Sequence, residues 1–208
     1  MAGRRIAAFD FDGTLTRRDT LLPFLVRSCG ARRVARSVSL AAPRAARSRV
    51  SRLQAEVHHR DATKEALLAH LLGGRSAQWL ADSGRSFATT LSDRLRPTMV
   101  EQVRWHRDQG HELIIVSASL RAYLEPFAAN QGFHHVIAVG LEADDRGVLT
   151  GRLDGPNVRG PEKAVQLRQW LGASPPEVMW AYGNSEGDAE LLAMADVPVW
   201  VAGPRSRL

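Results

Sequence analysis

Two carboxylates separated by a single residue follow the first apolar segment of the chain. Residues 6–9 form a short apolar run that predicts a buried strand, and residues 10–16 read Asp-Phe-Asp-Gly-Thr-Leu-Thr. Because side chains alternate along a strand, we expect Asp10 and Asp12 to point to the same side. Two neighbouring carboxylates repel each other unless they bind a cation or share a proton. The segment therefore predicts a polar site at the end of the first strand, where open α/β sheets bind ligands.

Further polar groups end or adjoin other predicted strands. Ser117 ends the apolar run 112–117, and residues 183–188, which read Gly-Asn-Ser-Glu-Gly-Asp, follow the predicted strand 178–182. Lys163 lies in the first turn of a predicted helix. Because the carboxyl ends of parallel strands meet at one edge of a sheet, we expect these groups to surround one ligand together with the two carboxylates. A carboxylate nucleophile, a second carboxylate for proton transfer, a hydroxyl and an ammonium suit phosphoryl transfer.

The order of predicted elements indicates an α/β fold with a doubly wound parallel sheet. Residues 17–96 show no strand pattern, and their apolar residues recur at helical spacing. We therefore expect a catalytic core formed by residues 1–16 and 97–208, with residues 17–96 inserted after the first strand as an all-helical cap. Within the cap, Asp61 or Thr63 is expected to begin a helix as its N-cap.

Four motifs follow one another along the chain: residues 10–16, Ser117, Lys163 and residues 183–188. Together they resemble the four motifs of the haloacid dehalogenase-like phosphatases. The helical insertion resembles the cap of the phosphoserine phosphatase-like branch, subfamily IB, and the resemblance implies a Rossmann-like core. It also implies that Asp10 is the nucleophile, forming an aspartyl-phosphate, and that Asp12 acts first as acid and then as base. Thr14 and Ser117 would bind the phosphoryl oxygens, and Lys163 would offset negative charge near the nucleophile.

The same resemblance implies a Mg²⁺ cofactor. Its ligands would be the Asp10 carboxylate, the backbone carbonyl of Asp12, Asn184 and Asp188. The fourth motif of the family usually begins with Gly-Asp, whereas this chain has Gly183 followed by Asn184. An amide oxygen still coordinates Mg²⁺, but the neutral side chain removes one negative charge. We therefore expect weaker metal binding or an altered metal preference.

Asp19 has two interpretations. It lies at the beginning of the expected cap, where phosphoserine phosphatases place a glutamate that holds the ammonium group of the substrate. By this resemblance Asp19 would bind a cationic part of the substrate. A carboxylate at this position can equally cap the helix expected to begin near Leu21. The sequence leaves both interpretations open.

The positive charge of the chain is concentrated in one segment. Residues 27–60 contain nine arginines and one acidic residue, whereas the whole chain has a formal net charge of +6. The segment could steer phosphorylated substrates or contact an anionic lipid surface, with Arg44, Arg47 and Arg49 as the candidate lipid contacts. A solvated helix face in an arginine-rich chain explains the same pattern. No aromatic residue interleaves these arginines, so no nucleic-acid partner is expected.

The composition predicts a soluble globular protein. The 208 residues are 44% hydrophobic and 24% charged, and no apolar run approaches the ~20 residues of a membrane helix. The single Cys29 cannot form an internal disulfide, which favours a reducing, cytoplasmic location. Among the 28 basic residues only Lys64 and Lys163 are lysines, which makes the position of each lysine informative.

The motifs at the strand ends predict phosphoryl transfer, and the resemblance implies a Mg²⁺-dependent phosphomonoester hydrolase of the phosphoserine phosphatase-like kind. Its substrate is expected to be a small phosphorylated metabolite, with amino-alcohol and lipid-derived phosphates among the candidates. The alternative is a phosphate-binding or regulatory protein that keeps the fold while Asn184 impairs turnover. The sequence determines neither the physiological substrate nor the oligomeric state.

Overall fold

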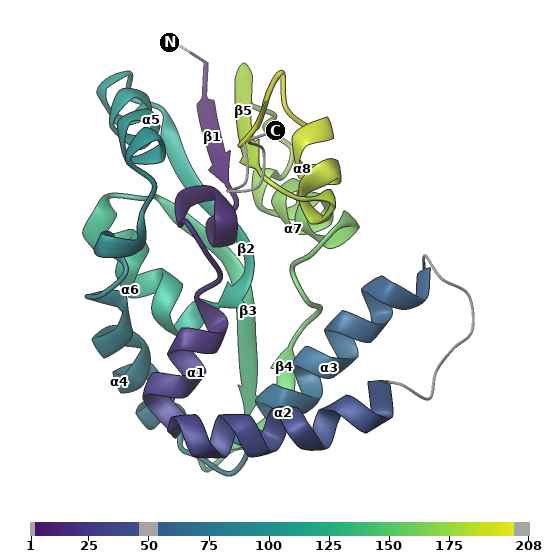
Figure 1. Cartoon of the computed structure of the whole chain (residues 1–208). Helices are drawn as coiled ribbons and strands as arrows, with labels where there is room; N and C mark the ends of the chain where they lie inside the picture. Colours follow the sequence, from purple (N-terminus) through teal and green to yellow (C-terminus); the bar gives the residue numbers. More distant parts are fainter. Residues whose placement is uncertain (1–2, 46–53, 202–208) are drawn as a thin grey trace, which may run out of the picture.

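The chain folds around one six-stranded sheet with helices on both faces (Figure 1). The computed structural model describes residues 3–45 and 54–201, and the side chains of all of these except 39–45 and 54–62. The strands are β1 (Arg5–Phe9), β2 (Glu112–Leu120), β3 (His135–Ala143), β4 (Leu149–Asp154), β5 (Val178–Gly183) and β6 (Val197–Trp200).

The order of the strands is β4-β3-β2-β1-β5-β6, and every neighbouring pair is parallel except β3 with β4. Helices α5 (Pro97–Asp108) and α6 (Arg121–Gln131) lie on one side of the sheet in Figure 1, and α7 (Pro161–Leu171) and α8 (Ala189–Ala193) lie on the other. This arrangement confirms the predicted α/β fold with a doubly wound, Rossmann-like core. Because β1 lies between β2 and β5, the carboxyl ends of these three strands adjoin one another.

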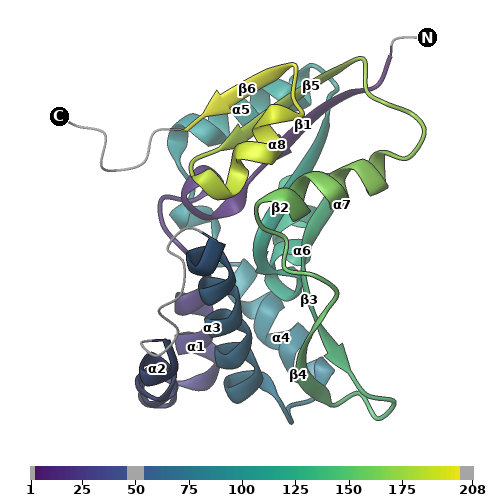
Figure 2. The ribbon, with the colours of Figure 1, turned by 90° about the vertical axis from the view of Figure 1, so that its right-hand side faces the viewer.

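In the described part of residues 10–96, four α-helices separate β1 from α5. They are α1 (Leu21–Cys29), α2 (Ala31–Ala45), α3 (Gln54–Leu72) and α4 (Ala77–Ala88). Figure 2 shows them gathered below the part of the molecule that holds β5, β6 and α8. We refer to α1–α4 as the proposed cap. The expected helix start at Asp61 or Thr63 is wrong, because both residues lie inside α3.

The ends of several helices follow from their sequences. The Ser76 side chain accepts a hydrogen bond of 3.1 Å from the backbone N–H of Trp79 and so caps α4. Pro97 occupies the first turn of α5, where its missing N–H costs no helical hydrogen bond. Gly132 ends α6 with a φ of +72°, in the left-handed region that glycine adopts without a steric penalty.

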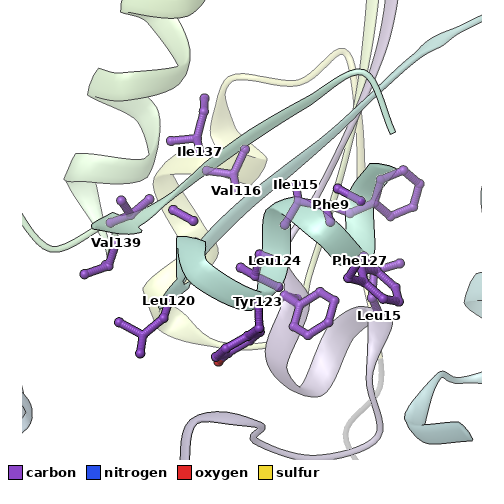
Figure 3. Packing of buried hydrophobic residues seen from close by; sticks show 14 of the residues in the cluster. Phe9, Leu15, Ile115, Val116, Leu120, Tyr123, Leu124, Phe127, Ile137 and Val139 are labelled. Carbon is purple, nitrogen blue, oxygen red and sulfur yellow. The ribbon is translucent and has the colours of Figure 1, made fainter. Parts of the chain in front are cut away.

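The core lies between the strands and α6 (Figure 3). Phe9, Ile115 and Val116 are fully buried on the two central strands. Phe127 of α6 meets Phe11 edge to face, with ring centroids 5.2 Å apart. Burial of each such side chain contributes about 1.5–3 kcal/mol to stability. This packing fixes the carboxyl end of β1 and the residues that follow it.

The proposed cap packs closely against the core. Gly84 of α4 packs directly against α6, since a Cβ built on Gly84 would lie 2.0 Å from the carbonyl oxygen of Ala122. The turn after α3 pairs with the turn of the β3–β4 hairpin through an antiparallel bridge between Ser76 and Val148. Within the described residues, no helix is long and apolar enough to cross a lipid bilayer.

Candidate active site

A cavity of about 350 Å³ opens where β1, β2 and β5 end. Six of the residues singled out in the sequence line it: Asp10, Asp12, Asp19, Ser117, Lys163 and Asp188. They come from four separate stretches of the chain, as expected for the edge of a parallel sheet. Thr14 and Asn184 are not among the lining residues.

Lys163 lies between two carboxylates. Its Nζ atom donates hydrogen bonds of 2.6 Å to Asp10 Oδ1 and 2.6 Å to Asp188 Oδ1, and all three residues are buried. Burial raises the pKa of the Asp10 carboxyl above its usual range; Lys163 opposes this effect and Asp188 adds to it. Although burial acts to lower the pKa of the Lys163 ammonium, the two carboxylates raise it. Lys163 is therefore a fixed positive charge beside Asp10.

Asp12 is held by the residues around it. Its Oδ1 atom accepts hydrogen bonds from the Thr20 backbone N–H at 2.8 Å and from the Thr20 hydroxyl at 2.7 Å, and its Oδ2 accepts one from the Ser119 hydroxyl. Burial and the nearby charge of Asp19 raise the pKa of Asp12 to about 7, while the bonds from Ser119 and Thr20 act in the opposite direction. A carboxyl group with this pKa can give or take a proton near neutral pH.

A buried tyrosine supports the contact between Thr20 and Asp12. Tyr123 Oη lies 3.2 Å from Thr20 Oγ1, and both residues are fully buried. Because the Thr20 hydroxyl donates to Asp12, it accepts from Tyr123. Burial raises the pKa of Tyr123, so its hydroxyl keeps the proton that this bond needs. Asp12 is thereby connected to the first turns of α1 and α6.

Ser117 lies at an irregularity in β2. The strand extends to Leu120, beyond the predicted end at Ser117, and its register with β3 shifts between these two residues. The Ser117 hydroxyl oxygen accepts a hydrogen bond of 3.1 Å from the Ser119 backbone N–H. Both serines line the cavity, as expected for residues two positions apart along a strand, whose side chains point to the same side.

Thr14 and Asp19 each make a local hydrogen bond. The Thr14 hydroxyl is fully buried and donates to Asp10 Oδ2 at 2.7 Å, so it contacts the carboxylate itself. Asp19 Oδ1 accepts a hydrogen bond of 3.2 Å from the backbone N–H of Leu22, in the first turn of α1. Asp19 also lines the cavity, so the geometry permits both interpretations of this residue. The roles of Thr14 and Asp19 in substrate binding stay predictions.

Asn184 adjoins the segment after β1. A Cβ built on Gly13 would lie 2.2 Å from Asn184 Nδ2, and Gly13 has a φ of +82°, so glycine is required there. The Asn184 amide thus lies against the residue that follows Asp12. The Asp10 carboxylate, the Asp12 backbone carbonyl and the Asn184 amide oxygen are donors of the kind that Mg²⁺ uses while it keeps several waters. This sparse oxygen set fits the predicted cofactor.

Asp188 is already surrounded by donors. Besides Lys163 on Oδ1, its Oδ2 atom accepts hydrogen bonds from the backbone N–H groups of Asn184 and Ser185, both at 3.0 Å, and from the Ser185 hydroxyl at 2.9 Å. Against the effect of burial, Lys163 and these donors lower the pKa of Asp188. Asp188 therefore positions Lys163 and residues 183–188, and its role as a metal ligand stays a prediction. Within the described ranges, no cluster of three or more His, Cys, Asp or Glu residues is arranged to hold a metal.

The sequence did not identify every residue at the cavity. Lys64 reaches it from α3 and donates to Asn157 Oδ1 at 2.6 Å and to the carbonyl oxygen of Ala118. Arg159 also lines the cavity, and its side chain has no hydrogen-bond or ion-pair partner among the described residues. The rarity of lysine was a signal for Lys64. Nothing in the spacing indicated Asn157 or Arg159, because their loop contains no motif.

The comparisons with known proteins agree with this geometry. The sequence model of the family described as "haloacid dehalogenase-like hydrolase" matches residues 7–193, which include all the strand ends at the cavity. This chain belongs to the haloacid dehalogenase-like hydrolases. Protein CicA of Caulobacter vibrioides is 35% identical over 196 residues, which cover 92% of this chain and 83% of CicA.

Two further proteins are similar to nearly the whole of this chain. A crystal structure of a protein of unknown function from Bordetella pertussis Tohama I has 26% identity and a TM-score of 0.77, and the match covers 97% of this chain and 92% of the other. Phosphoserine phosphatase SerB2 of Mycobacterium tuberculosis is 28% identical over 198 residues, which cover 94% of this chain and 44% of SerB2. The predicted resemblance to the phosphoserine phosphatase-like members is thereby confirmed.

Proposed function

We propose that this hydrolase removes the phosphoryl group from a phosphomonoester through an aspartyl-phosphate on Asp10. The observation that carries the proposal is the pair formed by Asp10 and Asp12 in one cavity. Asp10 is paired with the fixed charge of Lys163, and the pKa of Asp12 is raised to about 7. One carboxylate is suited to attack, and the other is suited to transfer a proton.

In the first step, an Asp10 oxygen attacks the phosphorus of the substrate. A bond forms between this oxygen and phosphorus, and the bond between phosphorus and the ester oxygen breaks. The leaving oxygen takes the proton of Asp12, so an alcohol departs and Asp12 becomes a carboxylate. Thr20 and Ser119, which donate to both Asp12 oxygens, stabilise that carboxylate as it forms.

In the second step, a water molecule attacks the phosphorus of the aspartyl-phosphate. Asp12 takes a proton from the water, the bond between phosphorus and Asp10 breaks, and inorganic phosphate leaves. Lys163 compensates the charge of the regenerated Asp10 carboxylate, to which it donates at 2.6 Å. Ser117, also at the cavity, is positioned to donate to a phosphoryl oxygen, because its hydroxyl proton is not used in its bond with Ser119.

Mg²⁺ is the proposed cofactor. Asp10, the backbone carbonyl of Asp12 and Asn184 would hold it, with Asp188 as a further candidate ligand. When bound, Mg²⁺ would neutralise phosphoryl charge and orient the phosphoryl group toward Asp10. Asn184 brings no negative charge, which supports the expectation of weaker metal binding.

The proposed substrate is a small phosphorylated molecule. The name of SerB2 assigns phosphoserine to that relative, and Asp19 at the cavity supports recognition of an ammonium group in this chain as well. If Asp19→Ala leaves the ranking of amino-bearing and neutral phosphate esters unchanged, Asp19 serves only α1. A cytoplasmic location is part of the proposal, in line with the single Cys29.

Hydrolysis of a generic aryl phosphate, measured with and without Mg²⁺, tests the proposal. We expect Mg²⁺-stimulated release of phosphate that Asp10→Asn abolishes. Asp145→Asn is the matched control, because Asp145 is exposed in the β3–β4 turn and is not among the residues that line the cavity. Tight phosphate binding without turnover across a broad ester panel would instead support the alternative, a phosphate-binding or regulatory protein.

A further inference from the structure

The segment before α1, together with α1 and the first part of α2, is rich in arginines that form no ion pairs within the described part of the chain. We call residues 17–38 the basic surface. Asp19 is the one acidic residue in this stretch of the sequence. Six arginines in it are all exposed: Arg17, Arg18, Arg27, Arg32, Arg33 and Arg36. None of these arginines forms an ion pair with another described residue. An anionic partner is therefore the complement of this region.

Apolar side chains are interspersed among these arginines. Leu22 and Val26 of α1 are 49% and 37% exposed, and their spacing of four residues places them on one face of the helix. Val38 of α2 is 47% exposed. These three are among only eight large hydrophobic residues that are exposed in the described part of the chain. The basic surface thus offers both positive charge and apolar side chains to a partner.

The basic surface adjoins the catalytic cavity. Asp19 and Leu21 line the cavity, and the exposed Leu22 is the next residue along α1. Figure 1 shows α1 extending from the segment after β1 toward α2. A molecule with its phosphate at Asp10 could therefore continue toward the apolar face of α1.

We propose that the basic surface binds an anionic membrane and that the substrate is a lipid phosphomonoester held in that membrane. The second part rests on the proposed function. Arginines at the headgroup level with leucine and valine side chains between them suit the interface of a bilayer. A single-stranded nucleic acid would need aromatic stacking, and the exposed tryptophans, Trp105 and Trp200, lie outside the basic surface.

The candidate lipid contacts that the structure describes lie in the first part of the arginine-rich segment 27–60. The earlier candidates Arg44, Arg47 and Arg49 have side chains outside the described residues, so they carry no part of the proposal. Arg32, Arg33 and Arg36 are described and exposed on α2. The predicted contact of the arginine-rich segment 27–60 with anionic lipid is thus retained only for its first part.

Flotation of the full chain with lipid vesicles tests membrane binding. We expect binding to vesicles that contain phosphatidylglycerol, little binding to pure phosphatidylcholine, and weakening as salt is raised. Replacing Arg32, Arg33 and Arg36 by serine should weaken binding on the order of 100-fold. The matched control replaces Arg104, Arg146 and Arg168, three exposed arginines of the core, by serine and should bind as the wild type does.

A second pair of variants tests the apolar face. Leu22→Ser with Val26→Ser should weaken vesicle binding roughly tenfold, while Val100→Ser with Val165→Ser, at similarly exposed positions of the core, should not. The cap variants should also hydrolyse vesicle-embedded lysophosphatidate more slowly, with unchanged hydrolysis of a soluble aryl phosphate.

Three results would overturn the inference: no binding of wild type to anionic vesicles, equal binding by cap and core variants, or preference for an oligonucleotide over vesicles. In each case hydrolysis of the aryl phosphate would leave the proposed function standing. Loss of that hydrolysis in the wild type would instead contradict the proposed function and leave membrane binding to be judged by flotation.

Discussion

At the scale of single residues, the site depends on charges that are buried but individually satisfied. Lys163 is bonded to Asp10 and Asp188, and Asp12 is bonded by Thr20 and Ser119. A buried charge without a partner is costly, so each of these contacts also contributes to stability. Residue substitutions here should therefore change both the chemistry and the free energy of unfolding.

Lys163→Met removes the positive charge between two buried carboxylates. We expect the free energy of unfolding to fall by about 3–5 kcal/mol, since Asp10 and Asp188 lose their common partner. Urea denaturation measures the change. Arg168→Met, at an exposed position of the same helix, should change stability by less than about 0.5 kcal/mol. Equal effects of the two substitutions would show that the buried ion pairs contribute nothing.

Asn184→Asp restores the charge that the family usually places at this position. We expect Mg²⁺ binding, measured by calorimetry, to tighten on the order of 10-fold to 100-fold, because a carboxylate attracts the cation more strongly than an amide. Asn157→Asp adds the same charge elsewhere at the cavity and is the control. If both substitutions tighten binding equally, Asn184 is not a metal ligand.

At the scale of secondary-structure elements, close helix packing connects the proposed cap to the core. Gly84 lets α4 approach α6, and α6 carries Tyr123, whose hydroxyl supports Thr20 and hence Asp12. Lys64 of α3 adds a second connection, to the Ala118 carbonyl between the two serines of β2. The elements that surround the cavity are therefore mechanically connected to its reacting groups.

Gly84→Ala should separate α4 from α6. Alanine favours a helix over glycine by about 1 kcal/mol, but its Cβ would meet the Ala122 carbonyl at 2.0 Å. We expect a net loss of about 1–3 kcal/mol in the free energy of unfolding, measured by thermal and urea denaturation. Ser86→Ala on the exposed side of α4 is the control. A stabilised Gly84→Ala variant would contradict the close packing of these helices.

At the scale of the whole molecule, a chain of neutral histidines connects α5 to the sheet. His106 Nε2 lies 2.8 Å from the Tyr182 hydroxyl and its Nδ1 lies 2.7 Å from His111 Nδ1. Since Tyr182 donates to Gln102 at 3.1 Å, it accepts from His106, whose Nδ1 then accepts from His111. Burial, with His111 nearby, lowers the pKa of His106 to about 4.

This histidine chain predicts how stability depends on pH. His106 is neutral in the folded state and has a pKa near 6.5 when unfolded, so its contribution is complete above pH 6.5 and is lost as the pH falls toward 4. The loss should be up to about 1.4 kcal/mol per pH unit. His106→Asn should flatten this slope in urea denaturation, whereas His70→Asn, at an exposed position, should not. An unchanged slope in His106→Asn would show that another group is responsible.

Much of the fold could be predicted because strand and helix patterns alternate after residue 97. The site could be predicted as far as its groups follow strands: Asp10, Asp12, Ser117 and Asp188 all reach one cavity. Lys163 reaches the same cavity from the first turn of α7. Ser119 was missed because the strand was predicted to end at Ser117, whereas β2 continues to Leu120 and presents Ser119 on the same side as Ser117. Arg159 depends on a loop whose path no periodicity encodes.

The same reasoning explains the errors within the proposed cap. Asp61 and Thr63 have the side chains of N-caps, yet the helical pattern continues through them, and the longer helix α3 is formed. Lys64, which donates to Asn157 at the cavity, lies inside this helix. Local capping preference was therefore a weaker determinant than the helix as a whole.

Acid-quenched trapping of the covalent intermediate is the most direct test of the central claim. The chain is mixed with an aryl phosphate and Mg²⁺, quenched during turnover, digested and mapped by mass spectrometry. We expect one phosphoryl group on Asp10, absent in Asp10→Asn and accumulating in Asp12→Asn, which should still form the aryl ester's phosphoenzyme but hydrolyse it slowly. Turnover with an unmodified Asp10, or phosphorylation of another residue, would contradict the claim that Asp10 is the nucleophile.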